Sequence, residues 1–204
     1  MKILTIDTTG SQVHVILQRA GDIIDDLEVA TRNGHAELLL PTVERLLGRN
    51  GLSCGSVDCF AALNGPGSFV GLRVSVAFLK ALRCARPGIK IILNSIFQVL
   101  AFRQSYDFVV LGAGVDGFYI YDREQHSFYI RRERGRDFLS IGSRIITNSP
   151  DAMDFLKSPN IIARQVGSRE VAALNHFRCV NEQFSEGRIE PVYIREPQVN
   201  TKNG

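Results

Sequence analysis

The chain has 204 residues, of which 45% are hydrophobic and 22% are charged. This composition excludes disordered and fibrous proteins, and the length suits one domain or two small lobes. The formal net charge of +3 is too small to indicate nucleic-acid binding by itself. Asp7 interrupts the first apolar stretch, and the longest apolar runs fall short of the roughly 18 residues that span a membrane. We therefore expect a cytoplasmic protein with no signal peptide and no membrane segment.

The N-terminal residues predict strands first and a helix afterwards. Strands are expected at 3–8, 13–18 and 23–30, and a hairpin-type connection separates the last two. Residues 34–48 then switch to a helical period. The apolar stripe of this helix consists of Ala36, Leu39, Leu40, Val43, Leu46 and Leu47.

Alternating strands and helices follow. Residues 57–63 predict a strand, 69–85 a helix and 89–93 another strand, and Ser95 is placed to cap a further helix. Three antiparallel strands followed by alternating helix and strand is the order of an actin-like, ribonuclease-H-like α/β lobe. The sequence therefore predicts a two-lobed actin-like fold.

The second half of the chain predicts a smaller lobe of the same type. Its expected strands lie at 108–111, 118–122, 128–132, 144–147 and 161–163. No Pro-, Gly- or Ser-rich linker separates the halves, so we expect the two lobes to abut. The expected division is an N-terminal lobe at 1–104, a C-terminal lobe at 105–197 and a frayed polar tail at 198–204.

Residues 65–73, GPGSFVGLR, join a predicted strand to a predicted helix. Gly65, Gly67 and Gly71 supply the backbone freedom of a tight turn, and Ser68 is the expected N-cap. Such a turn can bind an anion at the helix N-terminus, or it can let strand and helix pack closely. The spacing matches neither GxGxxG nor GxxxxGK[ST]. If the turn is structural and Gly67 has positive φ, Gly67→Val should destabilise the protein.

The sequence GPGSFVGLR after a short strand resembles the signature of the TsaB family, the dimerisation subunit of the bacterial tRNA threonylcarbamoyladenosine machinery. Three further stretches agree with that family in order and spacing, namely 3–9 (ILTIDTT), 35–41 (HAELLLP) and 191–195 (PVYIR). The chain departs from the family pattern at Val70, where Thr is usual, and at 113–117, which is AGVDG in place of DARxG.

The resemblance implies an actin-like fold and a non-catalytic subunit without metal or cofactor. The implied role is to bind and stabilise a TsaD-type catalytic subunit and to help recruit a TsaE-type ATPase. Proteins of this family pair through their first two helices, with a second copy when alone or with the catalytic paralogue. Contact with tRNA is expected to be indirect only.

The segment Asp7-Thr8-Thr9 stands where an actin-like enzyme would place a phosphate-binding turn. It can also be a capped β-turn whose side chains bond their own backbone, and this is the interpretation that we favour. A nucleotide site needs both lobes, and its counterpart in the second half is only Asp116-Gly117. An independent ATP-dependent phosphotransferase using Asp7, Thr8 and Asp116 is the alternative function.

No catalytic residue is expected. TsaD-type transferases carry a His-x3-His metal pair on their first long helix, whereas here His35 is followed by Leu39 at the second position. This missing histidine also argues against a metallopeptidase, a third hypothesis. The four cysteines lack zinc-type spacing, so we expect them to be reduced thiols.

Residues beyond the core stripes of the first two helices indicate a partner interface. Pro41 lies inside the first helix, where it should cause a bend. Full burial between sheet and helix would explain most apolar residues of the second helix. It would not explain Phe69 and Val76, which lie among cationic residues of that helix. The expected interface consists of His35, Leu38, Pro41, Thr42, Arg45, Phe69, Arg73 and Val76. The basic run at 131–136 is expected to be an exposed turn after a strand. Contact of this run with RNA phosphates is the less favoured alternative.

Overall fold

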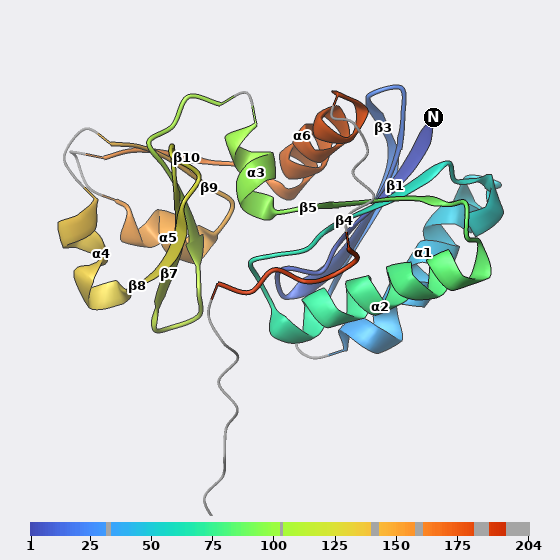
Figure 1. Cartoon of the computed structure of the whole chain (residues 1–204), viewed down its shortest axis with the longest axis horizontal. Coiled ribbons are helices and arrows are strands. Elements are labelled where there is room, and N and C mark those ends of the chain that lie inside the picture. Colours follow the sequence, from blue (N-terminus) through green and yellow to red (C-terminus); the bar gives the residue numbers. More distant parts are fainter. Residues whose placement is uncertain (32–33, 103, 140–142, 158–160, 182–187, 195–204) are drawn as a thin grey trace, which may run out of the picture.

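The computed structural model describes residues 1–31, 34–102, 104–139, 143–157, 161–181 and 188–194. The predicted frayed tail at 198–204 lies outside the described residues. Two β-sheets lie at opposite ends of the molecule, and helices cover them (Figure 1). None of the helices within the described ranges has the length and apolar character needed to cross a membrane.

The first sheet has five strands in the order β3-β2-β1-β4-β5. The strands are β1 (Lys2–Asp7), β2 (Gln12–Arg19), β3 (Asp22–Ala30), β4 (Cys59–Leu63) and β5 (Lys90–Asn94). The first three strands are antiparallel, and β4 and β5 run parallel to β1. Ala20 and Gly21 have positive φ in the turn between β2 and β3, as a two-residue hairpin requires. This sheet and the helices on its faces are called the first lobe below.

Two long helices cover one face of the first sheet. They are α1 (His35–Arg49) and α2 (Phe69–Ala85), which also contact each other. Their buried side chains join those of the sheet in one apolar core, whose members include Leu39, Val43, Phe60 and Leu79. A 3-10 turn, η1 (Cys54–Ser56), follows α1. On the other side of the sheet lies α6 (Ser168–Asn181), where Cys179 packs with residues of β1 and β4 (Figure 1).

The second sheet repeats this topology with shorter strands, in the order β10-β9-β6-β7-β8. The strands are β6 (Phe108–Gly112), β7 (Gly117–Asp122), β8 (Ser127–Arg131), β9 (Arg144–Thr147) and β10 (Ile162–Gln165). In both sheets the first two strands form an antiparallel pair, and a later strand pairs in parallel with the first. The repeated order confirms the predicted actin-like fold with a reduced second lobe.

Short helices complete the second lobe and join it to the first. The helices α4 (Arg132–Phe138) and α5 (Pro150–Phe155) lie beside the second sheet. Between the sheets lies α3 (Ile96–Ala101), whose apolar side chains pack with Val109, Leu111 and Ile146 of the second sheet and with Val171 of α6 (Figure 1). The two lobes therefore share an apolar core at their junction.

The structure corrects two predictions about elements. The basic run at 131–136 enters the helix α4 and is not a turn, because Arg132 stacks over Phe118 and binds Asp151 on α5. Leu40 does not belong to the core stripe of α1, since its side chain is 48% exposed. Ala36 is exposed as well.

Candidate functional site

The GPGSF turn, residues 65–69, places the start of α2 against the end of β1. The Ser68 backbone N–H donates to the Thr9 carbonyl at 2.7 Å, and the Ser68 hydroxyl accepts from the Gly71 N–H at 3.2 Å, as predicted for an N-cap. A Cβ at Gly71 would lie 1.9 Å from the Thr8 carbonyl oxygen, and one at Gly67 would lie 2.6 Å from that of Thr9. Glycine at both positions is therefore required by close approach of two backbone segments.

Gly65 has a different requirement. Its φ is +126°, and an added Cβ would lie 2.4 Å from the Val192 carbonyl oxygen. The Val192 N–H in turn donates to the Asn64 carbonyl at 2.7 Å. The segment at 188–194 thus returns to the GPGSF turn, and positive φ occurs at Gly65 and not at Gly67.

The Asp7-Thr8-Thr9 segment forms the hydrogen bonds of a capped turn. Asp7 Oδ1 accepts from the Thr9 N–H at 2.9 Å and from the Thr9 hydroxyl at 2.6 Å. The buried Thr8 hydroxyl donates to the Gly71 carbonyl at 2.8 Å. Thr8 therefore links this turn to α2, whereas Asp7 and Thr9 face a pocket.

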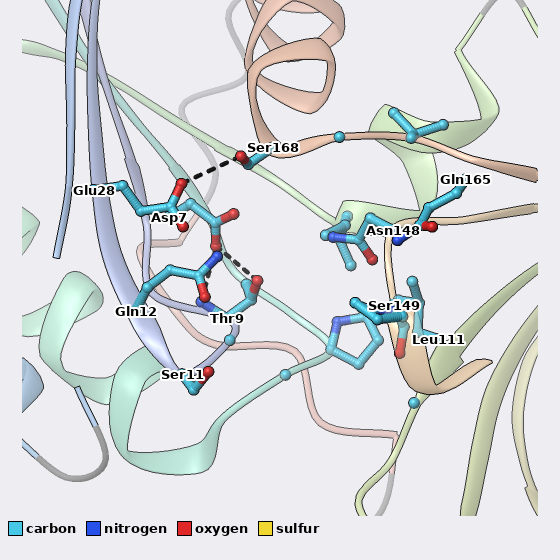
Figure 2. Close-up of a pocket in the computed structure, with 18 residues that line it drawn as sticks. Asp7, Thr9, Ser11, Gln12, Glu28, Leu111, Asn148, Ser149, Gln165 and Ser168 are labelled. Atoms are coloured by element: carbon cyan, nitrogen blue, oxygen red, sulfur yellow. Dashed lines mark hydrogen bonds between the residues drawn. The ribbon is translucent and has the colours of Figure 1, made fainter. Parts of the chain in front are cut away.

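That pocket, the interlobe pocket, has a volume of about 500 Å³ and lies between the two lobes (Figure 2). Its wall in the first lobe comes from the β1–β2 turn, Glu28 of β3 and the GPGSF turn. The opposite wall comes from the ends of β6, β9 and β10 and the residues after them. The polar side chains of the pocket are those of Asp7, Thr9, Ser11, Gln12, Glu28, Asn148, Ser149, Gln165 and Ser168.

The second-lobe wall was not predicted from the sequence. Asp116 is exposed and does not line the interlobe pocket, although we predicted it as the second-lobe counterpart of Asp7. The wall includes Ser149, which caps α5 by accepting from the Ala152 N–H at 3.3 Å, as Ser68 caps α2. The signal that could have found it is Ser149-Pro150 after a predicted strand, a helix start with proline at the first position.

His35 is a buried packing residue in this structure. Its side chain is almost fully buried, and Nε2 lies 3.1 Å from the Gly10 carbonyl oxygen. Across the described part of the chain, the one group of at least three His, Cys, Asp or Glu side chains close enough to share a metal ion is Asp122, Glu124 and His126 on the β7–β8 hairpin. His35 does not belong to it.

The predicted interface residues divide by burial. His35, Thr42 and Val76 are buried within the chain, and Leu38 is half-buried against the core of the first lobe. The Thr42 hydroxyl donates to the Leu38 carbonyl at 2.7 Å, so this buried hydroxyl has a partner within α1. The remaining four are exposed, namely Pro41, Arg45, Phe69 and Arg73.

Exposed apolar side chains occur near the starts of α1 and α2. Phe69 stacks on Tyr193 with ring centroids 5.3 Å apart, and the Arg73 guanidinium lies 5.2 Å from the Phe69 centroid. Leu40 and Val70, which we did not predict here, are 48% and 51% exposed. Both helices start near the β1–β2 turn, because His35 contacts Gly10 and Ser68 contacts Thr9. The α1–α2 surface is defined here as Leu40, Pro41, Phe69, Val70, Arg73 and Tyr193.

Residues 28–112 match the family model of TsaD, tRNA N6-adenosine threonylcarbamoyltransferase. Two curated relatives are named tRNA threonylcarbamoyladenosine biosynthesis protein TsaB. The chain is 33% identical over 82 residues to the protein from Escherichia coli (strain K12) and equally so to that from Haemophilus influenzae. These matches cover 40% of this chain but only 35% and 34% of the two relatives, so the sequence likeness spans about a third of their length.

Solved structures extend the likeness to nearly the whole chain. YeaZ from Pseudomonas aeruginosa superposes with a TM-score of 0.71 at 20% identity, covering 94% of this chain and 99% of that one. The ethanolamine utilization protein EutJ from Carboxydothermus hydrogenoformans reaches 0.51 at 11% identity, over 85% and 88%. At identities of 20% and 11% these superpositions establish only a shared fold. The similarity to TsaB proteins comes from the sequence matches. Over about two fifths of its length the chain is therefore similar in sequence to TsaB proteins, and over nearly all of it the chain has the fold of YeaZ.

Proposed function

We propose that this chain is a non-catalytic subunit of the complex that transfers threonylcarbamoyl to the adenosine beside the anticodon of tRNA. Its role is to bind and stabilise a TsaD-type catalytic subunit, and its contact with tRNA is indirect. The observation that carries the proposal is the exposed α1–α2 surface, most of which lies within the residues that match the TsaD family model. Because the substrate is tRNA, the proposal places the protein in the cytoplasm.

The assignment of a non-catalytic role rests on the absence of a metal pair on α1. His35 is buried and bonded to the backbone of the β1–β2 turn, and Leu39 one turn later is a core residue. Two histidines one turn apart would be needed to hold an ion from this helix. No metal or cofactor is therefore part of the proposal.

The α1–α2 surface suits a protein partner. Large exposed apolar patches are uncommon on monomeric proteins and mark interaction sites, and on this surface Phe69 contacts both Tyr193 and Arg73. Phe69, Tyr193 and Arg73 belong to residue types that dominate binding energy at interfaces. The proposed interface keeps the eight residues predicted from sequence. Of these, the exposed Pro41, Arg45, Phe69 and Arg73 contribute directly, and the buried residues support the helices from within.

The same surface would pair two copies of the chain when the catalytic subunit is absent. A TsaE-type ATPase is proposed to join the complex of the two subunits. The proposed lobes remain 1–104 and 105–197, with α6 and the segment at 188–194 packing back onto the first sheet.

The alternative of an independent phosphotransferase is not favoured. The Thr8 hydroxyl is buried and bonds the Gly71 carbonyl, and Asp116 lies away from the interlobe pocket. Only Asp7 of the three proposed residues faces that pocket.

Reconstitution with the TsaD-type protein of the same host tests the proposal. The two proteins should elute together in size-exclusion chromatography, and transfer of threonylcarbamoyl to tRNA should require both of them with the ATPase. Separate elution at micromolar concentrations, or full transfer activity without this chain, would reject the subunit role.

A further inference from the structure

The interlobe pocket has a chemical character of its own, which the proposed subunit role does not use. Among its lining residues, all of which the structure describes, the charged side chains are those of Asp7 and Glu28. The pocket contains no Lys, Arg or His in this lining. A phosphate group entering it would meet two carboxylates and no cationic side chain of the lining, and like charges repel in a partly desolvated site.

Asp7 points to a ligand most directly. Its residue is only 9% exposed, and Oδ1 accepts both hydrogen bonds from Thr9. No hydrogen bond or ion pair from the described residues reaches Oδ2, the second carboxylate oxygen. This oxygen is not among the fully buried, unpartnered atoms of the described residues, so it opens into the pocket, where a ligand can bind it.

Glu28 stands at the rim of the same pocket. Its side chain is 47% exposed, and Oε2 accepts from the Ser168 hydroxyl at 3.3 Å. Ser168 is the first residue of α6, which packs on the first sheet, so this bond joins β3 to α6 at the edge of the pocket (Figure 2). The two carboxylates thus mark a deep position and an outer position in one cavity.

The remaining polar groups of the pocket are neutral. Figure 2 shows Asp7 and Thr9 on the first-lobe side, and Asn148, Ser149 and Gln165 on the second-lobe side. Hydroxyl and amide groups offer both donors and acceptors, which suits the hydroxyl groups of a ligand. A volume of about 500 Å³ is large enough for a molecule of sugar size and lies in the usual range for small-molecule sites.

We propose that the interlobe pocket binds a small hydroxylated primary amine, whose ammonium group is held by Asp7 and whose hydroxyl groups contact the neutral walls. An ammonium supplies the three donors that the unpartnered Asp7 oxygen and the Glu28 carboxylate can accept, and its charge matches the pocket. A neutral sugar would bring no positive charge to Asp7, whereas Glu28 already has His14 Nδ1 at 4.0 Å from its Oε2. This proposal does not depend on the subunit role.

Isothermal titration calorimetry of the full chain with glucosamine, glucose and Mg·ATP tests the proposal. Glucosamine should bind and glucose, which differs by the amine, should bind about tenfold or more weakly. Asp7→Asn should weaken glucosamine binding by about tenfold or more, because it removes the charge but keeps an oxygen for the Thr9 bonds. Glu28→Gln, at an exposed position, should weaken glucosamine binding by a smaller factor. The thermal melting midpoint of Asp7→Asn shows whether that variant folds, and if it does not, Glu28→Gln carries the test.

The control variant removes the negative charge of two carboxylates that lie outside the interlobe pocket. The double variant Asp122→Asn/Glu124→Gln neutralises two carboxylates of the β7–β8 hairpin and should leave glucosamine affinity unchanged. Equal affinity for glucose and glucosamine, no glucosamine binding, or binding unaffected by both pocket variants would overturn the proposal. Binding of Mg·ATP with Asp7 dependence and without glucosamine competition would instead assign the pocket to phosphate.

Discussion

Single glycine positions decide how closely the backbone segments of the GPGSF turn approach β1. Gly71 lies in the first turn of α2 directly over Thr8, which leaves no room for a Cβ. Gly67 contacts Thr9 in the same way, although its φ is not positive. The predicted sensitivity of Gly67 to substitution therefore has a different physical cause from the positive φ that we considered.

Gly71→Ala should lower the free energy of unfolding by about 1–3 kcal/mol, because a Cβ 1.9 Å from a carbonyl oxygen forces the helix away from β1. Chemical denaturation measures the change. Gly48→Ala is the matched control, since Gly48 lies in α1 with nothing within 4 Å of its added Cβ, and it should be neutral or slightly stabilising. Equal stability of Gly71→Ala and wild type would contradict the close approach.

The cysteines differ in reactivity for reasons of burial. Desolvation raises the pKa of the Cys59 thiol to about 12, so at pH 8 this residue is protonated as well as inaccessible. Cys84 is exposed on α2. A thiol-reactive reagent at pH 8 should therefore modify Cys84 in the native protein and Cys59 only after denaturation. Peptide mass spectrometry reads out both sites, and labelling of native Cys59 at the rate of Cys84 would refute the prediction.

At the scale of elements, the helix α2 both packs into the core and forms part of the α1–α2 surface. Its inner face packs into the core through Leu72, Val76 and Leu79, while Phe69, Val70 and Arg73 belong to the α1–α2 surface. Val76 was predicted at the interface because it lies among cations, but in the single chain it is buried. An interface test therefore belongs at Val70, which is 51% exposed.

Val70→Glu should weaken binding of the TsaD-type subunit by about 2 kcal/mol or more, because it places an unpaired charge in an apolar contact. The fold should persist, since a glutamate in the first turn of a helix is favourable. Analytical ultracentrifugation or calorimetry with the partner measures the loss. Val115→Glu, at an 86% exposed position of the second lobe, should bind normally, and the core variant Leu39→Asp should unfold. Undiminished binding by Val70→Glu would move the interface away from this surface.

The helix α6 is a second element whose role depends on contacts far along the chain. It belongs to the second half of the sequence, yet it packs on the first sheet through polar contacts. The Gln18 amide donates to the Ala172 carbonyl at 3.1 Å, and Asn94 bonds Asn175 at 2.6 Å. These bonds pair the buried Asn175 Oδ1 and the amide nitrogens of Gln18 and Asn94, which would otherwise destabilise the junction.

For the whole molecule, the arrangement predicts that the isolated chain does no chemistry of its own. It should neither hydrolyse ATP nor transfer threonylcarbamoyl to tRNA, because α1 carries no histidine pair and the interlobe pocket has no cation to hold phosphates. Elemental analysis should find no stoichiometric transition metal. ATP turnover by the purified chain that disappears in Asp7→Ala would favour the phosphotransferase instead.

The sequence by itself determined the elements whose signals are local. Helical periodicity and the Ser68 cap located α2 at its observed bounds, and Ala20-Gly21 lies at the hairpin turn between β2 and β3. The order of these elements was enough to predict the actin-like fold. The helices α4 and α6 were not predicted, because tertiary contacts and not a helical period of apolar residues stabilise them.

Only the tertiary structure decided which residues share a site. Tyr193 meets Phe69, and Gln165 and Asn148 face Asp7, across separations of more than a hundred residues. Periodicity records which side of an element is apolar, but it carries no information on which distant segment covers that side. Leu40 was therefore predicted to be a core residue and is exposed in the fold. Val76 was predicted to lie at the interface and is buried. The topology of the two repeated sheets brings these residues together.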